Sequence, residues 1–264
     1  MSTDQAVIKR KLLNVATTGR FATFTPQEIN NHTKQLKSYL QNHQDKLDSI
    51  ELFQLFELDF YLSLITGHDI EAKAVLERLN DQFGNKVSSQ RIKLLKSIYF
   101  EAIGDLKSAG EILSEDPDEL QLSRRLTTMS RHADDLKYIN NLVYYLNLAP
   151  GDVVAWCELA DEYAKLKEFS KAIHCLKRVL VIEPDAYTVF NKIALLYRLS
   201  SIDSKKDKSA LLQSSVKEYL RSIDINKNNK STWEGLYSTI HEMEGSSEKE
   251  TMMTICEREI NRLI

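Results

Sequence analysis

The sequence predicts an all-α protein, a right-handed solenoid of helical hairpins. The 264 residues include only eight Gly and four Pro, well below the averages of about 7% and 5%. A β-sandwich or barrel needs frequent Gly- and Pro-rich turns, which this chain cannot supply. A two-helix pattern of apolar residues also recurs along the chain, as expected for a repeat architecture.

The clearest repeat covers residues 153–185, VVAWCELADEYAKLKEFSKAIHCLKRVLVIEPD. Apolar residues at i, i+3, i+4 and i+7 form one face of a first helix, and a second periodic run follows a polar break. Two such helical runs within about 34 residues are typical of the tetratricopeptide repeat. Small residues let the two helices approach closely, and large residues fill the space around the contact. The repeat core expected in this segment is Trp156, Leu159, Ala160, Tyr163, Ala172 and Leu176, closed by the helix-ending Pro184.

The same template continues on both sides of this repeat. Downstream, Phe190 and Tyr197 repeat the first-helix face, and Trp233 opens a further unit. A polar insertion at residues 200–209 is expected to form a mobile loop inside the downstream hairpin. Upstream, Gly67 and Gly104 recur about one repeat length apart in the expected inter-helix turns. The spacing predicts roughly five or six hairpins.

The first residues follow a different pattern. Thr25-Pro26-Gln27-Glu28 is a capping box with proline at the first helical position. It predicts a helix to about residue 42, after an earlier helix over roughly residues 4–17. Because solenoids need atypical ends to cover their apolar faces, residues 1–45 are expected to form an N-terminal helical cap. Residues 48–264 are expected to form the repeat array, ending in a C-terminal capping helix.

Charge and cysteine usage limit the class of protein. The net charge is −3 and the pI about 6.1, whereas nucleic-acid-binding domains usually exceed a pI of about 9. The three cysteines lack a CxxC pair, which is typical of a reducing compartment. The N-terminus lacks a signal-peptide core, and no stretch approaches the ~20 apolar residues of a membrane span. We therefore expect a soluble chain that faces the cytosol, with no nucleic-acid partner and no direct membrane span.

Motifs for catalysis, cofactors or metals are not found. The sequence has no GxGxxG, GxxxxGK[ST], HExxH, GxSxG or EF-hand loop. The histidines do not pair with one another or with cysteine at metal-ligand spacing. His174 and Cys175 are adjacent, so on a helix they point about 100° apart. We expect no enzymatic activity, no cofactor and no metal.

Two groups of polar residues are candidates for partner binding. The first is basic and consists of Arg91, Arg124, Arg125 and Arg131. The second is expected to line the groove formed by the first helices and consists of Asp161, Lys165, Asn191 and Arg198. For the basic group the alternative is an ordinary solvated helix face. A groove that holds a C-terminal carboxylate is not expected, because Cys157 and Asp161 occupy the positions of the cation and the amide that such a clamp uses.

Three stretches resemble a known family. They are residues 89–102, SQRIKLLKSIYFEA; Asp116-Pro117 followed by a helix with Arg124-Arg125; and residues 151–184, from Gly-Asp to the closing proline. Their order and spacing are similar to those of the tetratricopeptide subunit, the second subunit, of the endoplasmic reticulum membrane protein complex, in a divergent, fungal-like form. The first 45 residues match weakly.

The resemblance implies a non-enzymatic scaffold bound peripherally at the cytosolic face of the endoplasmic reticulum membrane. Its partners would be cytosolic segments of membrane-spanning subunits and a second soluble subunit. The whole complex would insert tail-anchored and multi-spanning proteins into the bilayer. A free cytosolic tetratricopeptide adaptor that binds linear peptides is the alternative. A helical-repeat RNA-processing factor is disfavoured by the charge.

Overall fold

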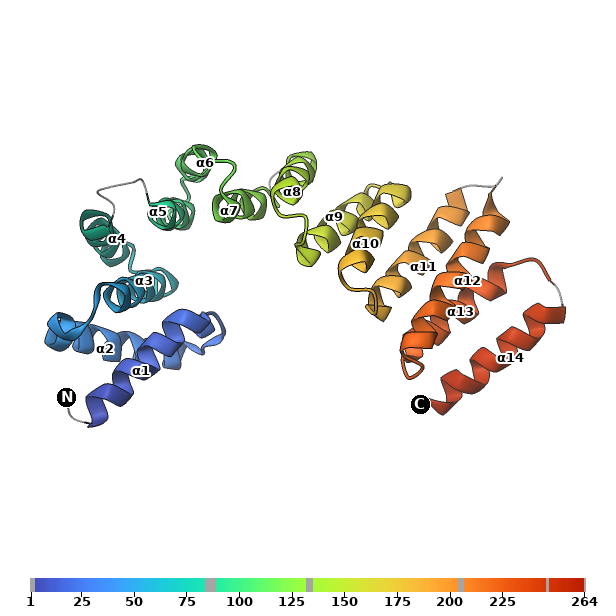
Figure 1. The fold of residues 1–264 in the computed structure, drawn as a ribbon, viewed down its shortest axis with the longest axis horizontal. Coiled ribbons are helices and arrows are strands. Elements are labelled where there is room, and N and C mark those ends of the chain that lie inside the picture. The colour runs from blue at the N-terminus through green and yellow to red at the C-terminus, as the bar shows by residue number, and fades with distance from the viewer. Residues whose placement is uncertain (1–2, 84–88, 132–134, 204–206, 246, 264) are drawn as a thin grey trace. The chain divides into compact units, whose positions relative to one another are not determined.

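The computed structural model describes residues 3–83, 89–131, 135–203, 207–245 and 247–263 (Figure 1). Within these ranges the chain forms fourteen α-helices and two short 3-10 helices, and no β-strand. The prediction of an all-α fold is therefore confirmed. The chain divides into two compact units, residues 1–129 and 130–264, and each is described by itself.

Unit 1 starts with the two helices that the sequence predicts. Its helices are α1 (Thr3–Thr18), α2 (Pro26–His43), α3 (Ser49–Ile65), α4 (Asp69–Phe83), α5 (Gln90–Ala102), α6 (Leu106–Ser114) and α7 (Leu120–Ser130). The capping box before α2 is confirmed, because the Thr25 side chain accepts from the Glu28 amide and the Glu28 carboxylate accepts from the Thr25 amide at 2.8 Å. Asp48 and Glu51 form a second capping box that starts α3.

The core of unit 1 is centred on α3. Helices α1, α2 and α4 all pack against it. Phe56, Leu58, Phe60 and Leu62 are therefore buried even though they project to different sides of the helix. The N-terminal helices thus cover apolar surface of α3. That residues 1–45 act as a cap, separate from an array over residues 48–264, stays a prediction.

Unit 2 consists of α8 followed by three hairpins. Its helices are α8 (Asp135–Leu148), α9 (Val153–Lys165), α10 (Phe169–Ile182), α11 (Tyr187–Asp203), α12 (Lys208–Ile225), α13 (Lys230–Glu242) and α14 (Ser247–Arg262). Within the described residues α9 packs on α10, α11 on α12 and α13 on α14. Neighbouring hairpins share further contacts, α10 with α11 and α12 with α13.

The repeat-core residues have unequal burial. Leu159, Ala160, Ala172 and Leu176 are at most 3% exposed and form one cluster at the α9–α10 contact. The partly buried residues are Trp156, Tyr163, Phe190 and Tyr197. Trp233 is buried in the next cluster along the chain. Pro184 is exposed in the turn after α10, so it acts by ending the helix rather than by filling the core.

The two tryptophans make the same contact with the backbone. The indole N–H of Trp156 donates to the carbonyl oxygen of Pro150 at 2.9 Å, six residues earlier. The indole N–H of Trp233 donates to the carbonyl oxygen of Lys227 at 2.9 Å, again six residues earlier. In both cases the first helix of a hairpin is joined to the turn that precedes it.

Three hairpin turns share a helix-terminal geometry that needs a left-handed residue. Gly67, Gly104 and Lys167 have φ values of 72°, 84° and 59°. At the third turn the Glu168 amide donates to the carbonyl oxygen of Tyr163 at 2.9 Å, which is the longer hydrogen bond of a Schellman motif. The equivalent bonds close the other two turns. Lysine therefore occupies a position that glycine fills elsewhere in the chain.

We expect Lys167→Gly to raise the free energy of unfolding by about 0.5–1 kcal/mol. The left-handed conformation costs a non-glycine residue about 1–2 kcal/mol, and the extra unfolded-state entropy of glycine offsets part of the gain. Urea unfolding followed by circular dichroism measures the change. Gly104→Lys is the matched control, and it should lower the free energy of unfolding by a similar amount. A loss of stability in Lys167→Gly would contradict a strained turn.

The predicted loop at residues 200–209 is largely helical. Helix α11 runs to Asp203 and α12 begins at Lys208, and residues 204–206 lie outside the described residues. Ser201 is only 1% exposed, and its hydroxyl donates to the carbonyl oxygen of Arg198 at 2.7 Å. The insertion lengthens the hairpin, since α11 and α12 have 17 and 18 residues while α9 and α10 have 13 and 14. For the described residues the loop prediction was wrong, because α11 and α12 pack against each other and this tertiary contact stabilises helix in a polar segment.

Candidate interaction surface

The candidate basic residues of unit 1 are paired within the chain. Arg91 of α5 places Nη2 2.7 Å and Nε 2.9 Å from Oε1 of Glu57 on α3. Arg125 of α7 pairs with Glu101 of α5. The first pair joins α3 to α5 and the second joins α5 to α7, so each pair connects two helices that are separated by one other helix along the chain. Burial raises the pKa of Tyr61, next to Glu57, to about 12, so its hydroxyl stays protonated near neutral pH.

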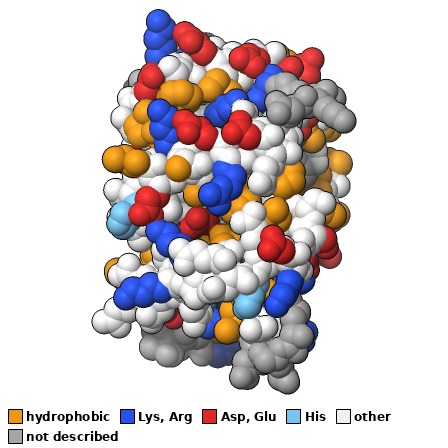
Figure 2. Space-filling model, turned by 90° about the vertical axis from the view of Figure 1, so that its left-hand side faces the viewer, with side chains coloured by type: hydrophobic (Ala, Val, Ile, Leu, Met, Phe, Trp, Pro, Cys, Tyr) orange, Lys and Arg blue, Asp and Glu red, His pale blue; other side chains and the backbone are white. Residues whose placement is uncertain are grey.

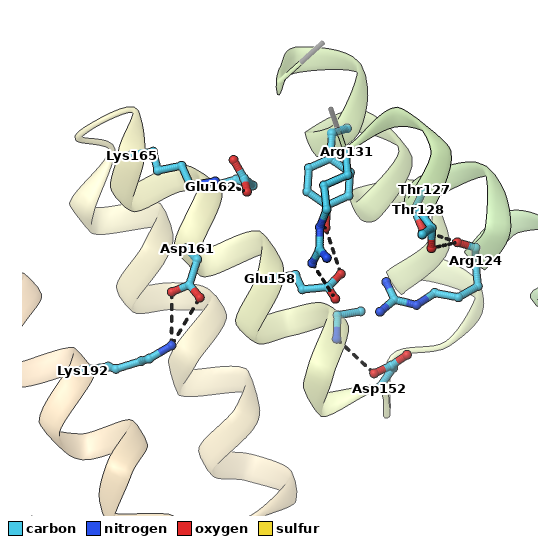
Figure 3. Close-up of polar contacts among 12 residues, drawn as sticks. Arg124, Thr127, Thr128, Arg131, Asp152, Glu158, Asp161, Glu162, Lys165 and Lys192 are labelled. Atoms are coloured by element: carbon cyan, nitrogen blue, oxygen red, sulfur yellow. Dashed lines mark hydrogen bonds and ion pairs between the residues drawn. The ribbon is translucent and has the colours of Figure 1, made fainter. Parts of the chain in front are cut away.

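Arg124 precedes Arg125 on α7. Its side chain is partly buried. Its carbonyl oxygen accepts hydrogen bonds from the hydroxyls of Thr127 and Thr128, at 2.5 and 3.0 Å (Figure 3). Both contacts involve the backbone of Arg124, so the partner-binding role of its side chain stays a prediction.

In unit 2 Arg131 belongs to a cluster built around a buried tyrosine (Figure 3). Arg131 Nη2 lies 3.0 Å from Glu158 Oε1 on α9. The Tyr138 hydroxyl donates to Glu158 Oε2 at 2.9 Å and accepts from Arg131 Nε at 3.2 Å. The Arg131 guanidinium carbon is 5.7 Å from the centroid of the Tyr138 ring. Burial raises the pKa of Tyr138, which keeps its hydroxyl available as a donor to Glu158.

The groove candidates are also engaged. Lys192 Nζ of α11 lies 3.2 Å from Asp161 Oδ1 on α9 (Figure 3). Arg198 Nε of α11 lies 3.0 Å from Glu242 Oε1 on α13. These two contacts join successive first helices. The amide of Asn191 on α11 donates to the Thr232 hydroxyl of α13 at 2.7 Å.

Lys165 is the exception among the groove candidates. Its ammonium group contacts Glu162 of the same helix at 2.6 Å, so it does not connect hairpins. Its side chain is 66% exposed, and it remains accessible to a partner.

We refer to five contacts as the inter-hairpin ion pairs. They are Glu57–Arg91 and Glu101–Arg125 in unit 1, and Arg131–Glu158, Asp161–Lys192 and Arg198–Glu242 in unit 2. Sequence reasoning selected one member of each pair and missed the other. The signal that could have identified the other member is an opposite charge on a helix of a neighbouring repeat. The two members of each pair lie 24 to 44 residues apart, which is about one repeat length.

Charges of both signs are also mixed on the one face of the molecule that Figure 2 presents. Figure 2 shows basic, acidic and hydrophobic side chains interspersed on one face of the molecule. This distribution agrees with the net charge of −3. A polar surface with alternating signs favours partners that match it in detail over partners attracted by a uniform field.

The thiols and potential metal ligands do not form a reactive centre in the described part of the chain. Burial raises the pKa of the Cys157 thiol, and it raises those of Cys175 and Cys256 to about 11. All three thiols are therefore protonated near neutral pH and weakly nucleophilic. The described residues contain no cluster of three His, Cys, Asp or Glu side chains that could hold a metal ion. Among the described helices, none combines the length and apolarity needed to cross a bilayer.

Comparison with known proteins gives concordant results. The family model "Tetratricopeptide repeat" matches residues 153–186, the repeat that the sequence shows most clearly. The crystal structure of the C-terminal part of a TPR repeat-containing protein from Cytophaga hutchinsonii superposes with a TM-score of 0.63 at 13% identity, covering 97% of this chain and 95% of that one. At this identity the likeness supports the fold alone.

Curated relatives extend the likeness over most of the chain. ER membrane protein complex subunit 2 of Saccharomyces cerevisiae is 24% identical over 236 residues, which cover 84% of this chain and 80% of the relative. TPR repeat protein oca3 of Schizosaccharomyces pombe is 30% identical over 207 residues, covering 76% of this chain and 69% of the relative. The resemblance noted in the sequence is thereby confirmed. The chain belongs to the family of tetratricopeptide-repeat proteins that includes oca3 and ER membrane protein complex subunit 2.

Proposed function

We propose that this chain is a non-catalytic scaffold subunit of an endoplasmic reticulum membrane protein complex. The observation that carries the proposal is the similarity to ER membrane protein complex subunit 2 over 84% of the chain. The scaffold binds peripherally at the cytosolic face of the membrane. It holds cytosolic segments of membrane-spanning subunits and docks a second soluble subunit. The assembled complex then inserts tail-anchored and multi-spanning proteins.

The inter-hairpin ion pairs support this role. Asp161 and Lys192 keep side chains 57% and 49% exposed while they pair, and an exposed pair of this kind contributes only about 0–1 kcal/mol. A charged group of a partner can therefore replace one member of the pair at low cost. Asp161 and Lys192 orient each other through their contact. A partner that replaces one of them must therefore place its own charge in a matching position, which makes binding selective.

A charge swap tests whether these pairs bind a partner. Asp161→Lys alone places two cations together and should lower the free energy of unfolding by about 1 kcal/mol or less. Combining it with Lys192→Asp restores the pair with reversed direction and should restore stability. Both variants should recover membrane-embedded subunits poorly when the tagged chain is purified from cells that express only that variant.

The matched control is the swap Lys73→Glu with Glu77→Lys, on an exposed pair of α4. It should leave both stability and recovery of the membrane subunits unchanged. If the Asp161–Lys192 swap also recovered the subunits at the wild-type level, this pair would be structural only and would not contact a partner.

A free cytosolic adaptor for linear peptides is the second candidate function, favoured by the tetratricopeptide match at residues 153–186. Cell fractionation separates the two candidates. A peripheral scaffold subunit sediments with membranes and is released by a carbonate wash. An adaptor is found in the soluble fraction before any wash, and that result would overturn the scaffold proposal.

A further inference from the structure

Unit 2 has an apolar pocket at a different place from the inter-hairpin ion pairs. Its volume is about 370 Å³, within the range of about 300–1,000 Å³ that is usual for binding pockets. Residues from three helices line it. They are Val143, Leu146 and Asn147 of α8; Trp156, Leu159 and Tyr163 of α9; and Ser170, Lys171, His174 and Cys175 of α10.

The pocket and the ion pairs use opposite sides of α9. Successive residues of a helix are rotated by about 100°. Tyr163 therefore projects about 200° from Asp161, the residue that pairs with Lys192. A partner in the pocket would leave the Asp161–Lys192 pair accessible, so the two surfaces can be occupied independently.

The pocket presents apolar side chains that other residues cover only in part. Val143 is 39% exposed, and Trp156 and Tyr163 are only partly buried although they pack against the core of the repeat. The indole N–H of Trp156 is already bonded to the carbonyl oxygen of Pro150. The ring therefore offers the pocket an apolar surface with its polar group satisfied.

Cations lie over both aromatic walls. Lys171 Nζ is 5.5 Å from the centroid of the Tyr163 ring, and the Arg178 guanidinium carbon is 5.7 Å from that of Trp156. The rings hold these long side chains near the pocket, which lowers the entropy lost when they bind an anion. The residues that line the pocket include no Asp or Glu. Glu168 lies 3.5 Å from Lys171, but both side chains are more than half exposed, so the pair is weak.

We propose that this pocket binds an acidic amphipathic helical segment of a partner protein. One bulky apolar side chain of the segment enters between α8 and α10. Carboxylates one turn away from it reach Lys171 and Arg178. The apolar walls and cationic rim match this chemistry, since an amphipathic helix in a groove presents apolar anchors flanked by charges. A basic segment would meet like charges at the rim.

An unbiased peptide selection tests the proposal. A random dodecamer display library is panned on the whole chain and counter-selected on Val143→Glu, which places a carboxylate in the pocket wall. Val181→Glu is the matched control, because Val181 is exposed on α10 and does not line the pocket. Enriched peptides should be acidic with one large apolar residue. They should bind Val143→Glu about tenfold more weakly than the wild type and Val181→Glu equally well.

A second variant and a spectroscopic readout locate the binding. Lys171→Glu with Arg178→Glu leaves the apolar walls intact and should lose about tenfold in affinity for the selected acidic peptides. The chain contains two tryptophans, so fluorine NMR of the 5-fluorotryptophan protein gives one signal from the pocket, Trp156, and one from α13, Trp233. Only the Trp156 signal should move on peptide addition.

Three results would overturn the proposal. The first is a selection that yields no peptide able to distinguish the wild type from Val143→Glu. The second is a set of pocket-dependent peptides that are basic or uncharged. The third is movement of the Trp233 signal without that of Trp156.

Discussion

Tyr138→Ala is expected to lower the free energy of unfolding by about 3–5 kcal/mol, the range for removing a buried aromatic ring. The side chain is 1% exposed and ranks among the largest fully buried ones in the described part of the chain. Its removal leaves a cavity and also takes the hydroxyl from Glu158, to which it donates at 2.9 Å. Urea unfolding followed by circular dichroism measures the loss, and the melting temperature should fall by roughly 10 °C.

Two further variants separate the contribution of the buried Tyr138 ring to stability from that of its hydroxyl. Tyr138→Phe keeps the ring and should cost about 1 kcal/mol, the net value of a typical hydrogen bond. Tyr144→Ala removes a tyrosine of the same helix that is 42% exposed, and it should cost about 1 kcal/mol or less. Equal losses from Tyr138→Ala and Tyr144→Ala would contradict the burial of Tyr138.

Gly235→Ala is expected to lower the free energy of unfolding by about 1–3 kcal/mol, the usual cost of overpacking. Helix propensity alone predicts the opposite, a gain of about 1 kcal/mol. A Cβ atom at position 235 would lie 2.6 Å from both Cζ and the hydroxyl oxygen of Tyr219. Tyr219 is 4% exposed, so its ring has little room to move. Thermal unfolding compares the variant with the wild type.

Gly110→Ala provides the matched control within α6. A Cβ atom there has no heavy atom within 4 Å, so the change should raise stability by up to about 1 kcal/mol. Tyr219→Leu in the Gly235→Ala background should recover part of the loss, because it removes the atoms that clash, and a double-mutant cycle measures this coupling. If both glycine variants were stabilised equally, the close approach of α12 and α13 at Gly235 would be disproved.

Local signals in the sequence predicted the local structure well. The capping box at Thr25, the core positions Leu159 and Leu176 and the turn at Gly67 each depend on residues only a few positions apart. The left-handed conformation of Lys167 was not predicted, because a glycine in the sequence indicates such a conformation and a lysine does not. The insertion was misread because Ser200 and its polar neighbours are typical of loops, whereas helix formation there depends on the opposite helix of the hairpin.

The sequence indicated which polar residues are candidates for partner binding, but it did not indicate the contacts that these residues make within the chain. Arg91 and Arg198 were selected as charges available to a partner, yet they pair with Glu57 and Glu242. The residues of these pairs are 34 and 44 positions apart. Their meeting depends on how successive hairpins are aligned, and no pattern within one helix encodes that alignment. The pocket near Trp156 was missed for the same reason, since it is formed by three helices together.

The inter-hairpin ion pairs and the apolar cores respond differently to ionic strength. The Debye length shortens from about 30 Å at 0.01 M salt to about 3 Å at 1 M, which weakens exposed pairs such as Asp161–Lys192. Apolar contacts such as Leu159 with its neighbours are not screened in this way. Salt therefore weakens the polar contacts between neighbouring hairpins, while the apolar contacts between them, to which Val189 and Ile193 of α11 contribute, are retained. The ionic strength of the solution thus adjusts the polar share of the contact between hairpins and leaves the apolar share in place.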